Sequence, residues 1–314
     1  MLYGKGVKQM KVAVVTGANG FIGKAIVREL LSQNVKVISV VHTIPQNLTE
    51  LEGSQVIECD LNHYSEITDQ LCELKPDVFY HLAWKGTAGP LRGNERTQLL
   101  NVQGTCDAVR LAKAAGCHKF VFASSIMQYE VDAEIKAMRC PGVNSIYSTA
   151  KMTADYMARI LASDLGMEYI SALISNIYGP GEKSPRLVNS SIRKLLKGEH
   201  VSLSSGEQLY DFIFVTDAAR MFAGIGTKGV PGRTYYIGNR QPRPLKDFLE
   251  ELKDAVAPKA ILGLGDLPFI GEGLTYEEFD TGLIYREIGI EPEISFIEGI
   301  KITKEWIVKE DCNG

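Results

Sequence analysis

Short apolar segments alternate with segments of helical periodicity through the first 175 residues of the chain. We predict six strands, at residues 11–16, 35–41, 55–59, 77–83, 119–124 and 168–174. The segments with the apolar spacing of helices are 21–33, 65–74, 95–115 and 145–165. Strands that alternate with helices pair in parallel through crossover connections. The alternation therefore predicts an α/β fold with a doubly wound parallel sheet.

The alternation ends near Asn176, and the rest of the chain follows a looser pattern. There we predict helices near 191–197 and 246–257, short strands near 212–215 and 234–237, and a glycine-rich loop at 263–273. A common domain has roughly 100–200 residues, and this chain has 314. We divide it into an N-terminal extension (1–10), a nucleotide-binding domain (11–175) and a smaller α/β substrate-binding cap (176–314), some segments of which return to the sheet.

Composition excludes several classes of protein. Hydrophobic residues make up 45% of the chain, which excludes a disordered protein. The net charge is −4 and no basic stripe is present, so nucleic acid is excluded as the main partner. No apolar run approaches the roughly 20 residues that span a bilayer, which argues against a membrane partner. Residues 1–10 lack an apolar signal core, which predicts a cytoplasmic location.

The six cysteines are scattered singly through the chain. None belongs to a CxxC pair, and the five histidines do not cluster near them. A zinc site needs close pairs of ligands. We therefore predict no metal site, and reduced thiols that act as small hydrophobic side chains.

A glycine-rich loop joins the first predicted strand to the first predicted helix. Gly17 permits a tight turn, Gly20 lets the backbone approach a pyrophosphate, and Gly23 lets the helix pack closely on the strand. The free N–H groups of the helix N-terminus then face the phosphate charge. This loop predicts a Rossmann-type dinucleotide site lined by Gly17, Asn19, Gly20, Phe21, Ile22 and Gly23.

Two other interpretations of the loop are open. Gly23-Lys24 resembles the end of a P-loop, but the first glycine of that motif would fall at Ala18 and its magnesium-binding hydroxyl at Ala25. The missing hydroxyl argues against nucleotide hydrolysis. A glycine turn without a ligand is the second alternative, and the strand–loop–helix setting argues against it.

The end of the second predicted strand bears on the choice of cofactor. An acidic residue there would hydrogen-bond the adenosine ribose and favour NAD. The stretch here is Val40-Val41-His42-Thr43, with neither an acid nor an arginine. His42 can approach a ribose or a 2′-phosphate, or it can lie in solvent. The predicted cofactor is therefore NAD or NADP.

A tyrosine and a lysine lie four residues apart on the helix predicted at 145–165. Tyr147 and Lys151 share one helix face at this spacing. A free tyrosine has a pKa of about 10, and a lysine one turn away lowers it, which gives an acid/base for a carbonyl or alcohol oxygen. Ser124 and Ser125 end the fifth strand, where doubly wound sheets bind ligands, and a serine hydroxyl there can bond the same oxygen. Alone, the Tyr/Lys spacing also fits simple packing.

Together these motifs resemble the extended short-chain dehydrogenase/reductases of the NAD-dependent epimerase/dehydratase family, which act mostly on nucleotide sugars. The resemblance runs from about residue 11 to beyond 217, and more weakly to Trp306. Other segments that match in order and spacing are Asp60-Leu61, His81-Leu82-Ala83, the residues 101–105, 176–180 and 211–217.

The resemblance implies a role for each matching residue. Tyr147 would be the acid/base, Lys151 would tune it and hold the nicotinamide ribose, and Ser125 would be the catalytic Ser/Thr. Further cofactor-binding residues would be His42, Asp60, Leu61, Leu82, Ala83, Trp84, Asn101, Ser124 and Ile177. Substrate-binding residues would be Ser125, Asn176, Arg186 and Tyr210. Trp84 would wall the nicotinamide pocket, or belong to the core.

Two departures from the family pattern narrow the expected chemistry. The family's 4,6-dehydratases carry an Asp-Glu pair directly after the catalytic Ser/Thr, where this chain has Ile126-Met127. In the family an arginine also binds the substrate diphosphate, and this chain has Tyr210 at that position. Candidate replacements are Lys183, Arg186, Arg193 and Arg243, with Arg186 first; each can also be a solvated surface charge.

These observations favour an NAD(P)-dependent oxidoreductase acting on a nucleotide sugar, in particular a 4-keto-sugar reductase. Dehydration is disfavoured because the acid pair is missing. A nucleotide-sugar 4-epimerase is the alternative within the same chemistry, and a non-catalytic NAD(P)-sensing module is the alternative of another class. The resemblance also implies a homodimer formed through the helices at 95–115 and 145–165.

Overall fold

The computed structural model describes residues 10–138, 140–271 and 273–313, so nearly all of the predicted N-terminal extension lies outside the described residues. The strands are β1 Val12–Thr16, β2 Lys36–Val41, β3 Gln55–Glu58, β4 Val78–His81, β5 Lys119–Ser125, β6 Glu168–Ile174, β7 Asn176–Tyr178, β8 Val201–Leu203, β9 Leu209–Tyr210, β10 Phe212–Phe214, β11 Thr234–Ile237, β12 Arg243–Pro244 and β13 Leu262–Leu264. The α-helices are α1 Phe21–Ser32, α2 Thr68–Leu74, α3 Glu95–Ala114, α4 Gln128–Lys136, α5 Ser145–Asp164, α6 Leu187–Leu196, α7 Val215–Lys228, α8 Leu245–Val256, α9 Leu283–Ile288 and α10 Phe296–Asn313.

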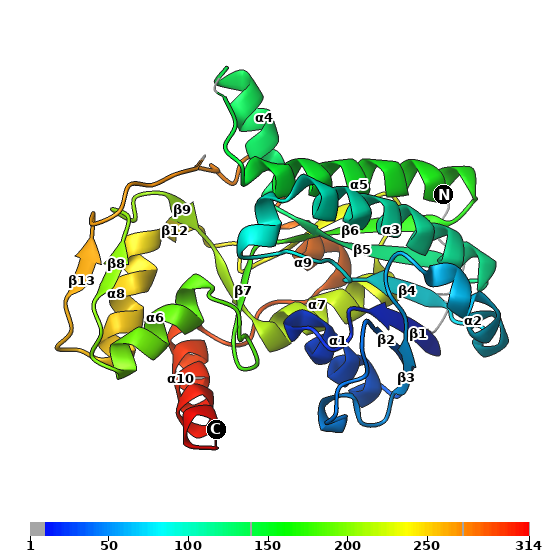
Figure 1. Ribbon diagram of the computed structural model, residues 1–314, viewed down its shortest axis with the longest axis horizontal. Helices are drawn as coiled ribbons and strands as arrows, with labels where there is room; N and C mark the ends of the chain where they lie inside the picture. Colours follow the sequence, from blue (N-terminus) through cyan, green and yellow to red (C-terminus); the bar gives the residue numbers. More distant parts are fainter. Residues whose placement is uncertain (1–9, 139, 272, 314) are drawn as a thin grey trace.

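The main sheet has seven strands in the order β11-β6-β5-β4-β1-β2-β3, and all neighbours are parallel (Figure 1). Successive residues of β1 face opposite sides of it. Val14 packs in the apolar cluster that includes α2, α3 and α5, while Ala13 and Val15 pack in the cluster that includes α1 and α7. Helices therefore cover both faces, and the predicted doubly wound α/β fold is confirmed.

Helix α5 lies close against the sheet because small residues form its inner face. Ala150, Ala154, Ala158 and Ala162 are spaced four apart and are buried. Residues at this spacing share one helix face. The first turns of α5, which carry Tyr147 and Lys151, are thereby held near the carboxyl end of β5.

The cap is built from three short strand pairs and the helices α6, α8 and α10. Strand β7 pairs with β10, β8 with β13, and β9 with β12. An aromatic group at its centre joins these elements, with ring centroids 4.8 to 6.1 Å apart between Tyr178, Phe212, Phe248 and Phe296. In Figure 1 the cap forms the left part of the molecule.

The structure differs from the sequence prediction in several elements. Helix α7 begins at Val215, which we predicted to end a strand, and the helices α4, α7, α9 and α10 were not predicted. The predicted loop at 263–273 is wrong at its start, because Leu262–Leu264 pairs with β8. Helix α7 (VTDAARMFAGIGTK) was missed although its buried Val215, Ala218, Phe222 and Ile225 recur with helical spacing. Within the described part of the chain, no helix combines the length and apolar character needed to cross a bilayer.

Candidate active site

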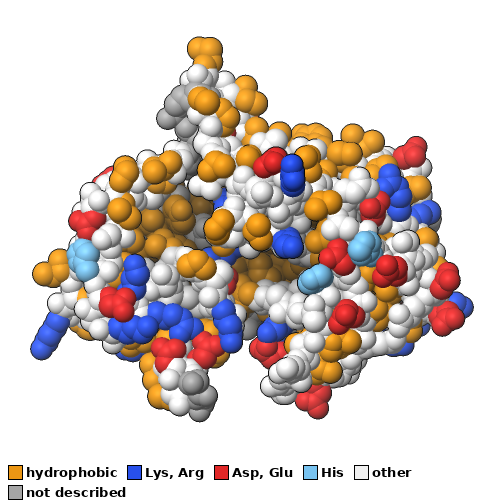
Figure 2. All heavy atoms as spheres, in the orientation of Figure 1, with side chains coloured by type: hydrophobic (Ala, Val, Ile, Leu, Met, Phe, Trp, Pro, Cys, Tyr) orange, Lys and Arg blue, Asp and Glu red, His pale blue; other side chains and the backbone are white. Residues whose placement is uncertain are grey.

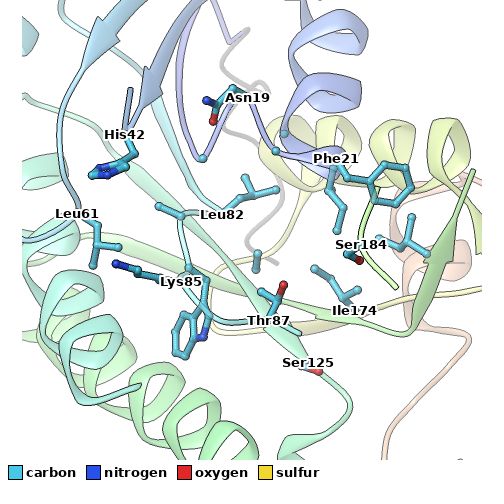
Figure 3. A pocket seen from close by; sticks show the side chains of 18 of the residues that line it. Asn19, Phe21, His42, Leu61, Leu82, Lys85, Thr87, Ser125, Ile174 and Ser184 are labelled. Atoms are coloured by element: carbon cyan, nitrogen blue, oxygen red, sulfur yellow. The ribbon is translucent and has the colours of Figure 1, made fainter. Parts of the chain in front are cut away.

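A cavity of about 500 Å³ opens at the carboxyl ends of β1, β2, β4, β5 and β6 (Figure 3). The molecular surface is hollowed between the main sheet and the cap, as Figure 2 shows. Doubly wound sheets bind ligands at this edge. Most predicted site residues line the cavity, namely Gly17, Asn19, Gly20, Phe21, Ile22, Gly23, His42, Asp60, Leu61, Leu82, Ala83, Trp84, Ser124, Ser125, Tyr147, Lys151, Ile177 and Arg186.

The glycine loop has the shape that a phosphate cradle requires. Gly17 has φ +68°, and a Cβ there would lie 2.9 Å from the backbone nitrogen of Ala83. A Cβ on Gly23 would lie 2.2 Å from the carbonyl oxygen of Gly17. Gly20 is the N-cap of α1, without a side-chain cap and with no acid in the first turn. The first N–H groups of α1 are therefore available to an anion in the cavity.

One end of the cavity holds the residues predicted to contact an adenosine. His42 Nδ1 lies 3.1 Å from Asp60 Oδ2, so the histidine at the end of β2 is held beside the predicted adenine-contacting pair. The N–H of Asn62 donates to Asp60 Oδ1, and this bond and the nearby histidines lower the pKa of Asp60 against the effect of burial. Figure 3 shows His42, Leu61 and Lys85 gathered at this end. No carboxylate of β2 itself occupies it.

Ser125, Tyr147 and Lys151 meet at the inner end of the cavity. All three are buried, at 8%, 6% and 5% exposure, yet each lines the cavity. Lys151 Nζ donates to the carbonyl oxygen of Ala123 (2.9 Å) and lies 3.7 Å from the ring centroid of Trp84. The Trp84 ring meets the Tyr147 ring edge to face at 6.1 Å.

The pKa of Lys151 falls to about 7, because burial penalises its charged form more than nearby Asp155 favours it. The ammonium is therefore close to its titration point at neutral pH. A buried amine of this kind can exchange or hold a proton near a reacting hydroxyl. The site thus combines a phenol, a tunable cation and a serine hydroxyl.

This depressed pKa makes the stability of the free protein depend on pH in a defined window. Below pH 7 Lys151 is protonated in both states. From about pH 7 to 10.5 only the unfolded state keeps the proton, so wild-type stability gains roughly 1 kcal/mol per pH unit from this residue. Lys151→Met lacks that gain. Urea unfolding at pH 7, 8 and 9 should show that the free energy of unfolding of the variant falls progressively below that of wild type as pH rises. The exposed Lys113→Met serves as the control, and equal pH slopes for all three proteins would contradict the prediction.

Three predicted site residues do not line the cavity. Asn101 lies behind it and bonds the backbone of Lys85 through both its Oδ1 and Nδ2 atoms. Asn176 Nδ2 donates to the carbonyl oxygen of Asp211, and the Tyr210 ring packs beside Phe212 with its centroid 5.7 Å away and its plane tilted by 34°. In the free protein these side chains support the walls, so their direct ligand contact remains only a prediction.

The sequence analysis missed several cavity residues. They are Val40, Cys59, Tyr64, Lys85, Thr87, Ala123, Ile174, Ser175, Glu182 and Ser184. Most of them end a strand of the main sheet or closely follow one. Position after a strand in a parallel sheet was the signal available for them. Glu182 and Ser184 follow the Gly179-Pro180-Gly181 turn, for which the sequence offered no such signal.

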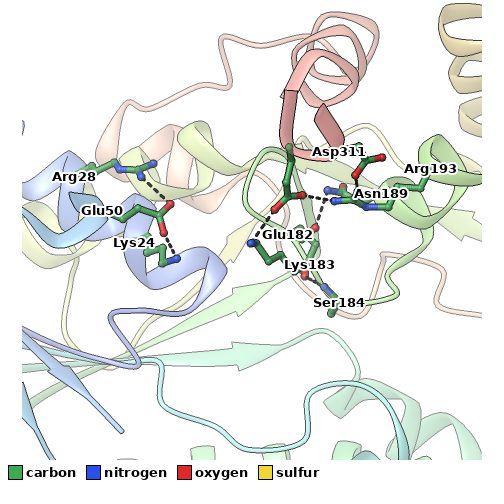
Figure 4. A network of polar contacts seen from close by, with 10 residues as sticks. Lys24, Arg28, Glu50, Glu182, Lys183, Ser184, Asn189, Arg193 and Asp311 are labelled. Carbon is green, nitrogen blue, oxygen red and sulfur yellow. Dashed lines mark hydrogen bonds and ion pairs between the residues drawn. The ribbon is translucent and has the colours of Figure 1, made fainter. Parts of the chain in front are cut away.

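The four candidate phosphate-binding cations of the cap have different surroundings, and Figure 4 shows two of them, Lys183 and Arg193. Lys183 pairs with Glu310 at 2.8 Å, and Arg193 with Glu310 and Asp311 at 2.5 and 2.7 Å. Arg243 pairs with Glu251 at 2.5 Å. Arg186 pairs with the buried Glu182 at 3.3 Å and is the one of the four that lines the cavity.

Comparison with known proteins agrees with this geometry. The sequence profile of the NAD-dependent epimerase/dehydratase family matches residues 13–238. The chain belongs to this family. A dTDP-glucose 4,6-dehydratase of Salmonella typhimurium is 26% identical over 338 residues, which cover 95% of this chain and 92% of the relative. The predicted family, and with it a nicotinamide dinucleotide as cofactor, are confirmed.

Solved structures of family enzymes share the fold. A UDP-glucose 4-epimerase from Thermotoga maritima, solved with UDP-glucose, has a TM-score of 0.77 at 22% identity, over 95% of this chain and 99% of that one. The Bordetella bronchiseptica enzyme WbmF, solved with NAD⁺ and UDP, has a TM-score of 0.77 at 20% identity, over 98% and 95%. At these identities the likeness concerns the fold.

Proposed function

We propose that this epimerase/dehydratase family member is an NAD(P)H-dependent reductase of a 4-keto nucleotide sugar. The nicotinamide, when bound, supplies a hydride for the carbonyl carbon. Tyr147 would protonate the carbonyl oxygen, and the Ser125 hydroxyl would orient it by a hydrogen bond. Lys151 would place a titratable ammonium beside Tyr147, and the first turn of α1 would hold the cofactor phosphates.

The surroundings of Ile126 and Met127 carry this proposal. Both side chains pack in an apolar cluster with Leu173 and Tyr236. Elimination of water from a sugar needs one group to protonate the leaving hydroxyl and another to remove a proton from carbon. Neither position can do this, so reduction or epimerisation is favoured over the dehydration named for the relatives. Glu130 is the nearest acid in sequence, and it accepts a hydrogen bond from Ser148 at 3.1 Å.

Two measurements on the purified protein test the proposal. Mass spectrometry of nucleotide released on denaturation reports whether a cofactor stays bound. A panel of UDP-glucose, UDP-N-acetylglucosamine, dTDP-glucose and their 4-keto-6-deoxy derivatives then reports NADH and NADPH oxidation and C4 isomerisation. An empty site with oxidation of NADH or NADPH by a keto sugar supports the reductase. Stoichiometric retained NAD⁺ with isomerisation of UDP-glucose would establish the epimerase instead, and a protein inert toward the whole panel would leave a sensing module.

A homodimer is also proposed, through α3 and α5. Exposed apolar side chains gather on both helices, namely Leu99, Leu100, Tyr156, Met157 and Ile160. Contiguous exposed apolar surface is typical of protein interfaces. A solution mass of twice the 34.6 kDa of one chain would support the dimer.

We further propose a cytoplasmic location. All six cysteines are free, and Cys59, Cys106 and Cys117 are buried as hydrophobic side chains. Unpaired thiols are typical of a reducing compartment.

A further inference from the structure

The loop between β4 and α3 is fastened to α3 by two buried amide side chains. Gln98 Nε2 donates to the carbonyl oxygens of Gly86 (3.2 Å) and Leu91 (2.9 Å). Asn101 bonds both the N–H and the carbonyl oxygen of Lys85, at 2.9 and 2.8 Å. A loop with this many bonds to one helix has a defined conformation. Its side chains therefore approach the active site from fixed positions.

Two side chains of this loop contact the Tyr147/Lys151 pair, Trp84 touching both residues and Arg92 touching Tyr147. Trp84 lies at 3.7 Å from Lys151 Nζ, and its Nε1 donates to Gln98 Oε1 at 2.9 Å. Arg92 carries its guanidinium 3.9 Å from the ring centroid of Tyr147. A cation over the face of an aromatic ring is attracted by the ring quadrupole. The loop therefore contacts both the phenol ring and the ammonium.

The surroundings of Arg92 leave its positive charge available to Tyr147. Its Nη1 donates to the carbonyl oxygen of Thr87 at 3.1 Å, and Thr87 lines the cavity (Figure 3). Within residues 10–138, 140–271 and 273–313, it forms no ion pair with a carboxylate. Its charge also affects Tyr210 of the cap. Burial raises the pKa of Tyr210 and Glu130 adds to the rise, while Arg92 opposes it.

We infer that Arg92 is a positioning residue for Tyr147, and that the loop between β4 and α3 orients the acid/base through this contact. The guanidinium restrains the phenol ring and keeps a permanent positive charge beside it. Lys151, with a titratable ammonium, cannot supply a permanent charge, whereas a guanidinium stays protonated. This inference rests on the proposed role of Tyr147 as the acid/base.

A double-mutant cycle between Arg92 and Tyr147 tests the inference. The probe is the panel sugar that the wild-type protein turns over fastest. Arg92→Gln should lower kcat and kcat/KM together by about tenfold, with KM and NADH affinity within twofold of wild type. Arg92→Lys keeps a cation over the ring and should recover part of the rate. In the Tyr147→Phe background, Arg92→Gln should cause no further loss.

Controls separate this inference from the proposed function. Arg96→Gln changes an exposed arginine of the adjoining α3 and should leave kcat unchanged. Unchanged thermal unfolding of Arg92→Gln shows that its loss of rate is not a loss of fold. If Arg92→Gln raises KM at constant kcat, or lowers the rate equally in the Tyr147→Phe background, Arg92 binds substrate directly and the inference is overturned. If Tyr147→Phe itself keeps wild-type activity, the proposed function fails instead.

Discussion

Replacing Tyr147 with phenylalanine should lower kcat by roughly 10²- to 10⁴-fold, the usual contribution of a positioned general acid or base. The hydroxyl is the only group removed, and the ring contacts with Trp84 and Arg92 remain available. The cofactor phosphates are expected at the distant glycine loop, so NADH affinity should change by less than threefold. Stopped assays with the sugar panel and NADH fluorescence titration measure the two quantities.

Tyr156→Phe is the matched control for this substitution. Tyr156 lies on the same helix, nine residues further along, and its side chain is 65% exposed. Loss of its hydroxyl should leave both kcat and NADH affinity unchanged. A Tyr147→Phe protein as active as this control would remove Tyr147 from the mechanism.

Replacing Gly23 with alanine should abolish binding of the nicotinamide cofactor. The new Cβ would lie 2.2 Å from the carbonyl oxygen of Gly17 and 2.9 Å from the Cα of Ala18, both of them backbone atoms of the phosphate loop. Backbone cannot move aside as a flexible side chain can, so either the loop or the start of α1 must shift. A displaced loop no longer presents its N–H groups to the pyrophosphate. Calorimetric titration should show at least a hundredfold weaker NADH binding.

Gly142→Ala provides the comparison, since a Cβ at Gly142 would meet no heavy atom within 4 Å. This variant should bind NADH as the wild type does. Circular dichroism distinguishes a local loop defect in Gly23→Ala from general unfolding. Wild-type NADH affinity in a folded Gly23→Ala protein would contradict the phosphate-loop assignment.

The sequence predicted the parts of the site that depend on local pattern. The glycine loop, Ser125 at a strand end and the Tyr147/Lys151 spacing each have their signal within a few residues, and the parallel sheet brings them to one edge. The contacts of Arg92 with Tyr147 and of Trp84 with Lys151 could not be predicted in this way. Each of these contacts joins residues more than fifty positions apart. They form only because Gln98 and Asn101 hold the loop between β4 and α3 in place.

The partners of the basic residues in the cap could not be predicted from the sequence either. The sequence placed Arg186 first among the four candidate cations but could not exclude Lys183, Arg193 and Arg243, because an isolated basic residue carries no sign of its partner. The ion pairs to Glu310, Asp311 and Glu251 depend on where α10 and α8 pack. Helix α7 is a different case, because its apolar residues do have helical spacing and the sequence analysis overlooked it; α7 packs against α1 and covers the sheet.

Strand β11 has a consequence for how the chain acquires its structure during synthesis. It pairs with β6 at one edge of the main sheet, yet about sixty residues of cap separate the two strands. While the chain is being made, the peptide groups of β6 on that side have no partner until residue 237 is available. Unpaired edges of this kind invite association with other chains. The residues between the two strands must therefore be made before this edge of the sheet can close.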